Sequence, residues 1–253
     1  MSQNSHQKGL KVSPPENPDT DQRPETPAER PWWKMSYPWF GVVGVVVLFN
    51  LLYSFPHYFS TDSADSRSVL DPGFEMHFAF LVAHVATGNL ALLAMMLQAW
   101  PYLRRTRPHV HRVVGRVYVF GAVVPTTLIV LFVLVPHRDI QGSTGLAVSA
   151  VLWLGTTLYA WHKARQGRYA EHRRWMVYSF SLALFTTYGR VVFLLMTHWG
   201  VEVNIQVLIE ATSWGMWVLH LLLAQAYLEY TARRSGRMPH SGRFDPATGA
   251  IRE

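Results

Sequence analysis

The sequence contains no cysteine and unusually little charge. Without thiols the chain cannot form a disulfide, a thiolate metal site, an iron–sulfur cluster or a covalently attached c-type haem. Only 15% of its 253 residues are charged, against roughly 25% in an average soluble domain. The 12 histidines are therefore the main candidates for any metal or cofactor chemistry.

Charged residues are nearly absent from six long apolar segments. The hydrocarbon core of a bilayer is about 30 Å thick, and a helix needs roughly 20 mostly apolar residues to cross it. A soluble bundle would need polar outer faces, which these segments lack. The sequence therefore predicts an all-α fold, a polytopic transmembrane bundle of six helices at about residues 38–56, 74–100, 112–135, 145–165, 172–198 and 205–231.

The two ends of the chain differ in composition from this six-helix domain at 35–231. Residues 1–34 carry six prolines and have no apolar centre, which is typical of a disordered tail and not of a signal peptide. Residues 232–253 are basic and rich in glycine and proline, and we expect a second flexible tail there.

Basic residues between the predicted helices lie mainly on one side. The segments after the second and fourth helices are rich in arginine, whereas the alternate segments hold few basic residues. Positive residues gather on the cytoplasmic side of a membrane, so both termini should be cytoplasmic. This topology explains the net charge of +7. It makes the lipid bilayer the expected partner and leaves no need for nucleic acid.

Two histidines lie deep in the predicted membrane. With a rise of about 1.5 Å per residue, His84 falls close to the middle of its helix and His220 somewhat past the middle of the last one. Ionisable groups at such depth are costly and mark functional or paired sites. Haem b held by two imidazoles needs one on each of two helices at similar depth. The sequence therefore favours His84 and His220 as ligands of a b-type haem.

Arg190 and Glu210 lie at comparable depths on the last two predicted helices. We expect an ion pair that clamps these helices together, because a lone buried arginine needs a partner. The alternative is that Arg190 anchors a ligand carboxylate, such as a haem propionate, while Glu210 is satisfied elsewhere.

A second group of histidines lies at the predicted cytoplasmic ends of the helices. A second haem could sit between His111 and either His162 or His172, with Arg112 or Arg116 near its propionates. Two haems stacked across the membrane would conduct electrons between a redox partner and an acceptor such as a quinone. The alternative is an ordinary positive border with interfacial histidines.

Two further classes of function stay open. A Cu, Zn or Fe ion could bind at the cytoplasmic histidine cluster, and the candidate metal ligands in the chain are His84, His220, His111 and His172. The chain could instead be an accessory or scaffold subunit with partner subunits, or a small transporter, without a redox cofactor. No nucleophile triad or nucleotide-binding loop is present, so no catalytic residue is assigned and the enzyme class stays open.

Three sequence stretches carry a family resemblance. They are HVATG at 84–88, PHVHRVVGRVY at 108–118 and EHRRWMVYS at 171–179. Together they resemble the prokaryotic multi-pass membrane family called domain of unknown function 2306, over roughly residues 75–230. The resemblance implies a fold and a place in the cytoplasmic (inner) membrane of a prokaryote, and no particular activity. The layout is also similar to that of cytochrome b561-type membrane cytochromes, which hold b haem between transmembrane histidines.

Overall fold

The computed structural model describes residues 32–58, 70–137, 142–200, 204–234, 243–245 and 250–252. Two units make up the chain, residues 1–37 and 38–253, and the helical bundle belongs to the second. Residues 1–31 of the predicted tail at 1–34 lie outside the described residues. Most of the predicted tail at 232–253 lies outside them as well.

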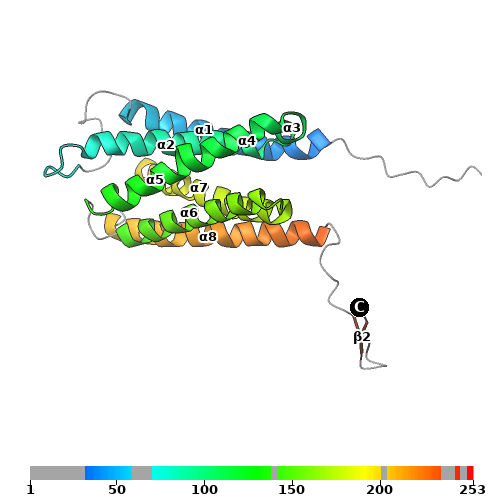
Figure 1. Cartoon of the computed structure of the whole chain (residues 1–253). Coiled ribbons are helices and arrows are strands. Elements are labelled where there is room, and N and C mark those ends of the chain that lie inside the picture. The colour runs from blue at the N-terminus through cyan, green and yellow to red at the C-terminus, as the bar shows by residue number, and fades with distance from the viewer. Residues whose placement is uncertain are drawn as a thin grey trace, which may run out of the picture. The chain divides into compact units, whose positions relative to one another are not determined.

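Helices dominate the described residues (Figure 1). Six helical stretches are long and apolar enough to cross a membrane, which confirms the predicted all-α transmembrane bundle: 40–58, 77–99, 108–134, 143–165, 169–196 and 206–234. The elements are α1 (Trp32–Tyr58), α2 (His77–Ala99), α3 (Pro101–Thr106), α4 (Pro108–Arg116), η2 (Val117–Val123), α5 (Val124–Ile129), η3 (Val130–Leu134), α6 (Ser143–Arg165), α7 (Tyr169–His198) and α8 (Ile205–Arg234).

A small antiparallel hairpin follows the bundle. It pairs β1 (Arg243–Asp245) with β2 (Ala250–Arg252). This hairpin lies within residues 232–253, where the sequence predicts a flexible tail.

The third membrane span changes its winding along its length. Pro101 and Pro108 stand in the first turns of α3 and α4, where a missing N–H costs no helical hydrogen bond. Pro125 lies further on, in α5, between the π-helical segments η2 and η3. A proline inside a helix removes one hydrogen bond and crowds the carbonyl four residues earlier. The wider π turns on either side accommodate that crowding without ending the helix.

Helices α6, α7 and α8 pack against one another, and Figure 1 shows α6 and α8 side by side. Gly145 permits the close approach of α6 to α8, because a Cβ atom there would meet the Ser213 carbonyl oxygen at 2.9 Å. Helix α2 packs mainly against the third span, from α4 to η3. The fully buried side chains at the centre include Met95, Tyr118 and Leu182.

A hydrogen-bonded network joins η2, α6 and α7 at this centre. Trp153 Nε1 donates to the Tyr118 hydroxyl over 3.2 Å, and that hydroxyl is 2.8 Å from Ser179 Oγ. Ser179 Oγ lies 2.6 Å from Thr157 Oγ1, which donates to the Trp153 carbonyl. One arrangement of hydrogens therefore satisfies every group in turn, and the network fixes the mutual orientation of three helices.

Candidate functional site

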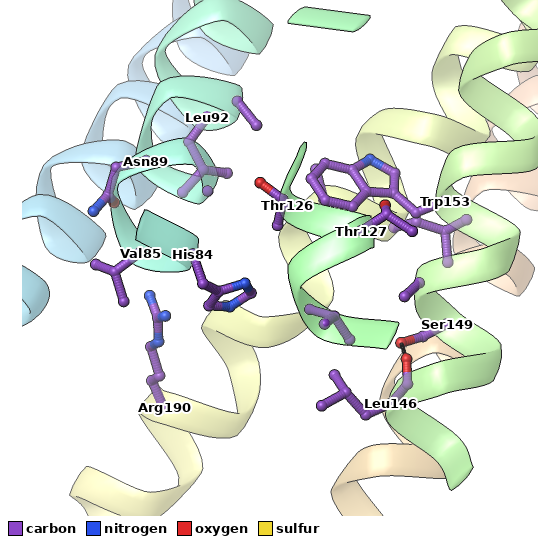
Figure 2. Close-up of a pocket in the computed structure, with 16 residues that line it drawn as sticks. His84, Val85, Asn89, Leu92, Thr126, Thr127, Leu146, Ser149, Trp153 and Arg190 are labelled. Atoms are coloured by element: carbon purple, nitrogen blue, oxygen red, sulfur yellow. Dashed lines mark hydrogen bonds between the residues drawn. The ribbon is translucent and has the colours of Figure 1, made fainter. Parts of the chain in front are cut away.

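A cavity of about 90 Å³ lies inside the bundle, between α2, the third span, α6 and α7 (Figure 2). Its lining is mixed: apolar side chains from every wall surround a few polar ones. The lining residues that can donate or accept a hydrogen bond through their side chains are His84, Asn89, Thr126, Thr127, Ser149, Trp153 and Arg190.

His84 and Arg190 enter the cavity from opposite helices. Figure 2 shows the imidazole of His84 on α2 and the guanidinium of Arg190 on α7 in the same space. His84 lies seven residues from the start of α2, and Arg190 lies eight residues from the end of α7. At about 1.5 Å per residue both are roughly 11 Å inside the same end of the bundle. Two basic side chains thus meet at membrane depth.

Arg190 is held by α1. Its guanidinium donates a hydrogen bond to Asn50 Oδ1 and lies over the Tyr53 ring, 5.4 Å from the centroid. Asn50 is completely buried, and its amide also donates to Thr187 Oγ1 over 2.9 Å. Among the described residues no carboxylate forms an ion pair with Arg190. Within the part of the chain that the structure describes, its positive charge therefore has neutral partners only.

The predicted ion pair between Arg190 and Glu210 is wrong. Glu210 Oε1 accepts a hydrogen bond from the backbone N–H of Gly142, 3.0 Å away, just before α6 begins. Gly142 adopts a left-handed conformation with φ of 74°, which turns its N–H toward α8. Equal depth along two helices does not determine the direction in which each side chain points. Here Arg190 contacts α1, and Glu210 contacts Gly142 just before α6. The alternative hypothesis had Arg190 anchoring a ligand carboxylate while Glu210 is satisfied elsewhere. The hydrogen bond between Glu210 and Gly142 agrees with its second part.

Hydroxyl groups complete the polar lining. Thr126 Oγ1 donates to Thr87 Oγ1 over 2.7 Å, and Ser149 Oγ donates to the Leu146 carbonyl over 2.7 Å. Thr127 is completely buried, and its hydroxyl has no hydrogen-bond partner among the described residues. A buried hydroxyl without a partner is costly. Thr127 is thus a further polar group that a ligand or water in the cavity could satisfy.

His220 lies elsewhere in the bundle. It is nearly buried, its Nδ1 lies 2.7 Å from the Met216 carbonyl, and its ring meets the edge of Tyr188 at 4.6 Å between centroids. His220 does not belong to the cavity lining that includes His84. The structure therefore does not bring these two predicted haem ligands together around this cavity.

The predicted cytoplasmic histidines are brought partly together. His111 on α4 lies within electrostatic reach of Arg104, His172 and Arg112. His172 on α7 places Nδ1 2.9 Å from the Ala160 carbonyl, whereas the exposed His162 has its ring nitrogen 3.0 Å from Gln166. Arg116 is exposed on α4. In the described part of the chain, no three histidine or carboxylate side chains gather closely enough to hold a metal ion.

Arginines surround this end of the bundle. The pKa of Arg104, in α3 between the second and third spans, is lowered from its ordinary value. Desolvation by neighbouring protein atoms is the largest cause, and the positive charges of Arg173 and Arg105 follow. Basic groups of α3 and α7 therefore repel one another electrostatically.

The fold and this buried polar cavity define a polytopic α-helical membrane protein. A family model described as "Predicted membrane protein (DUF2306)" matches residues 81–228, more than half of the chain. The chain belongs to this family. The family resemblance seen in the sequence is thereby confirmed, and its description assigns no chemistry. The comparison with curated proteins found no match, and the comparison with solved structures found none either.

Two polar residues that shape the site, one beside the cavity and one in its lining, were not predicted from the sequence. Asn50 holds Arg190, and Thr127 presents its hydroxyl to the cavity. The available signal was polarity within apolar segments, since amides and hydroxyls often join helices inside membranes. The predictions from sequence rested on ionisable residues, and Asn50 and Thr127 are neutral.

Proposed function

We propose that the protein binds a small anion inside the membrane, in the cavity lined by His84 and Arg190, and that it acts as a small transporter. The observation that carries this proposal is the positive charge of Arg190 beside a cavity, where its partners among the described residues are all neutral. An unpaired charge at membrane depth costs several kcal/mol. A bound anion would remove most of that cost.

The lining supplies the groups that an anion needs. The guanidinium of Arg190 offers several N–H donors in a planar fork, which suits a carboxylate or a comparable oxyanion. The Thr127 hydroxyl and the His84 ring lie around the same space. At about 90 Å³, the cavity is smaller than the roughly 150 Å³ cavity that takes up benzene. The anion must therefore be small, such as a carboxylate of few carbon atoms or a simple inorganic anion.

Thermal unfolding in detergent tests this proposal. We expect formate, acetate, nitrate or chloride to raise the unfolding midpoint of the purified protein, because a ligand at 100 times its Kd adds about 2.7 kcal/mol of stability. Arg190→Gln should abolish the shift. Arg165→Gln is the matched control, since Arg165 is exposed and stacks over the Trp161 ring at the end of α6.

Two results would contradict the proposal. One is that none of these anions changes the midpoint of the unaltered protein. The other is that the Arg190→Gln protein responds as strongly as the Arg165→Gln protein.

We also propose that both termini are cytoplasmic and that the protein resides in the inner membrane of a prokaryote. The basic segments beside α3 and at the start of α7 support this orientation. The chain has no cysteine, so one introduced thiol reports one position. In intact cells, an impermeant maleimide should label Asn204→Cys and leave Thr106→Cys unlabelled. The reverse pattern would invert the topology.

Haem b for transmembrane electron transfer is the second candidate, and one observation favours it. His172 Nδ1 faces the Ala160 carbonyl at 2.9 Å, so its proton sits on Nδ1 and the lone pair of Nε2 is available to an iron atom. His111 is within electrostatic reach, and Arg112 could bind a propionate. Haem would supply one-electron chemistry. The cavity at His84, about 90 Å³ in volume, is too small for a porphyrin. This second candidate function is therefore limited to one haem at the predicted cytoplasmic side.

An absorption spectrum separates these candidates. A haem protein should show a Soret band and a sharp reduced α-band, and His172→Ala should remove them while His162→Ala should not. A colourless protein with stoichiometric copper, zinc or iron would instead favour a metal ion on the cytoplasmic histidines. A colourless, metal-free preparation would exclude haem b and leave the anion site.

A further inference from the structure

The cavity at Arg190 is basic at one depth and apolar at another. On α2, Ala91 and Leu92 follow His84 by about two helical turns, so all three residues lie on one face of the helix. All three line the cavity. At about 1.5 Å per residue, the apolar pair lies roughly 11 Å deeper in the bundle than the imidazole. This wall therefore changes from basic to apolar along the length of the cavity.

The facing wall has the same order. Helix α7 packs against α2 and runs in the opposite direction, so the residues before Arg190 lie deeper in the bundle. Leu182 and Ala183 precede Arg190 by about two turns and also line the cavity. Both helices contribute these apolar residues to one buried hydrophobic cluster. We call this part of the cavity its apolar end, and it is lined by Ala91, Leu92, Leu182 and Ala183.

The donors that can still bind an anion lie at the level of Arg190. Thr127 is seven residues from the end of the third span, which places its hydroxyl about as deep as the guanidinium. That buried hydroxyl has no partner among the described residues. Closer to the apolar end, Trp153 Nε1 already donates to Tyr118, and Figure 2 shows Asn89 on the side of α2 that faces α1. The described lining therefore offers hydrogen bonds to an anion at one end of the cavity only.

We infer that the anion of this site is a short-chain monocarboxylate, with its carboxylate at Arg190 and its alkyl tail in the apolar end. This inference rests on the proposed anion site. The carboxylate oxygens match the planar guanidinium fork. The tail fills space that an inorganic anion would leave empty, or leave to water without polar partners. A dicarboxylate does not fit, because its second charge would lie among apolar side chains without a donor.

A series of acids tests this assignment. The dissociation constants of formate, acetate and propionate are measured from the thermal unfolding of the full chain in detergent, at neutral pH and constant ionic strength. A buried methylene contributes about 0.8 kcal/mol, which is about fourfold in affinity. We therefore expect the dissociation constant to fall about fourfold at each step of the series. Chloride and nitrate should bind no more tightly than formate, and malonate should bind at least about tenfold more weakly than propionate.

Gly88→Ala tests where the tail lies. Gly88 lines the cavity one turn deeper than His84, and a Cβ atom added there would meet no other atom within 4 Å. The new methyl group therefore takes space from the tail without a clash. The gain in affinity from formate to propionate should fall from about sixteenfold to fourfold or less. Gly155→Ala is the matched control, because Gly155 is exposed on α6, has the same open space and does not line the cavity.

The outcomes separate this inference from the anion site itself. If none of the anions binds, the site and the inference both fail. If formate, chloride or nitrate binds and Arg190→Gln abolishes that binding, but propionate gains nothing over formate, the anion site stands and the monocarboxylate assignment is overturned. An equal gain from formate to propionate in the Gly88→Ala and Gly155→Ala proteins would also overturn it.

Discussion

Replacement of Asn50 by leucine should lower the free energy of unfolding by about 2–3 kcal/mol, which is the usual cost of losing a hydrogen bond to a charged group. Asn50 is completely buried and accepts the hydrogen bond of Arg190. Leucine has a similar volume, so little of the loss would come from packing. The Arg190 guanidinium would keep only the Tyr53 ring as a described contact.

A double-mutant cycle isolates this interaction. Asn50→Leu, Arg190→Leu and the double variant should be unfolded in mixed detergent micelles, with the midpoint and slope measured for each. Because the two residues share one hydrogen bond, the double variant should lose at least 1 kcal/mol less than the sum of the single losses. Leu52→Ile on the exposed face of α1 is the control. Additive losses would mean that the contact contributes nothing.

Replacement of Tyr118 by phenylalanine should cost about 2 kcal/mol of unfolding free energy, because it leaves the buried Trp153 N–H without an acceptor and removes the hydrogen bond that Ser179 accepts. Trp153 Nε1 loses its only described partner, and Ser179 Oγ keeps Thr157 alone. Polar contacts in membranes average less than this, but here three helices share one closed network. The same micelle unfolding measurement gives the value.

The control for this substitution is Tyr102→Phe, which removes a hydroxyl from an exposed ring at the surface. Its unfolding free energy should stay within about 0.5 kcal/mol of the unaltered protein. If Tyr118→Phe and Tyr102→Phe had equal effects, the network would not hold η2, α6 and α7 in place.

The six membrane spans could be predicted because apolar length alone decides whether a helix can cross a bilayer. The change of winding around Pro125 could not be predicted, since it depends on how the chain relieves one clash. The partner of Arg190 was missed for a similar reason. Depth can be counted from the sequence, but the direction of a side chain depends on how each helix rotates against its neighbours.

His84 illustrates the limit most clearly. The sequence correctly places an imidazole at membrane depth, and the structure adds that it shares a cavity with Arg190. His220 has a comparable depth, yet it packs against Tyr188 on α7. Pairing residues by depth therefore needs knowledge of which helices are neighbours, and helix contacts in a six-helix bundle do not follow from composition.

The π-helical segments have a consequence for how this fold can change. Each π turn accommodates about one residue more than an α turn of the same length. A single-residue deletion within η2 would let the segment rewind as α-helix and leave the residues after it on their present faces, whereas the same deletion in a regular α-helix rotates everything after it by roughly 100°. Thr126 and Thr127 would therefore still line the chamber that contains Arg190. The length of this span can thus change by one residue at η2 without any change in the walls of the chamber.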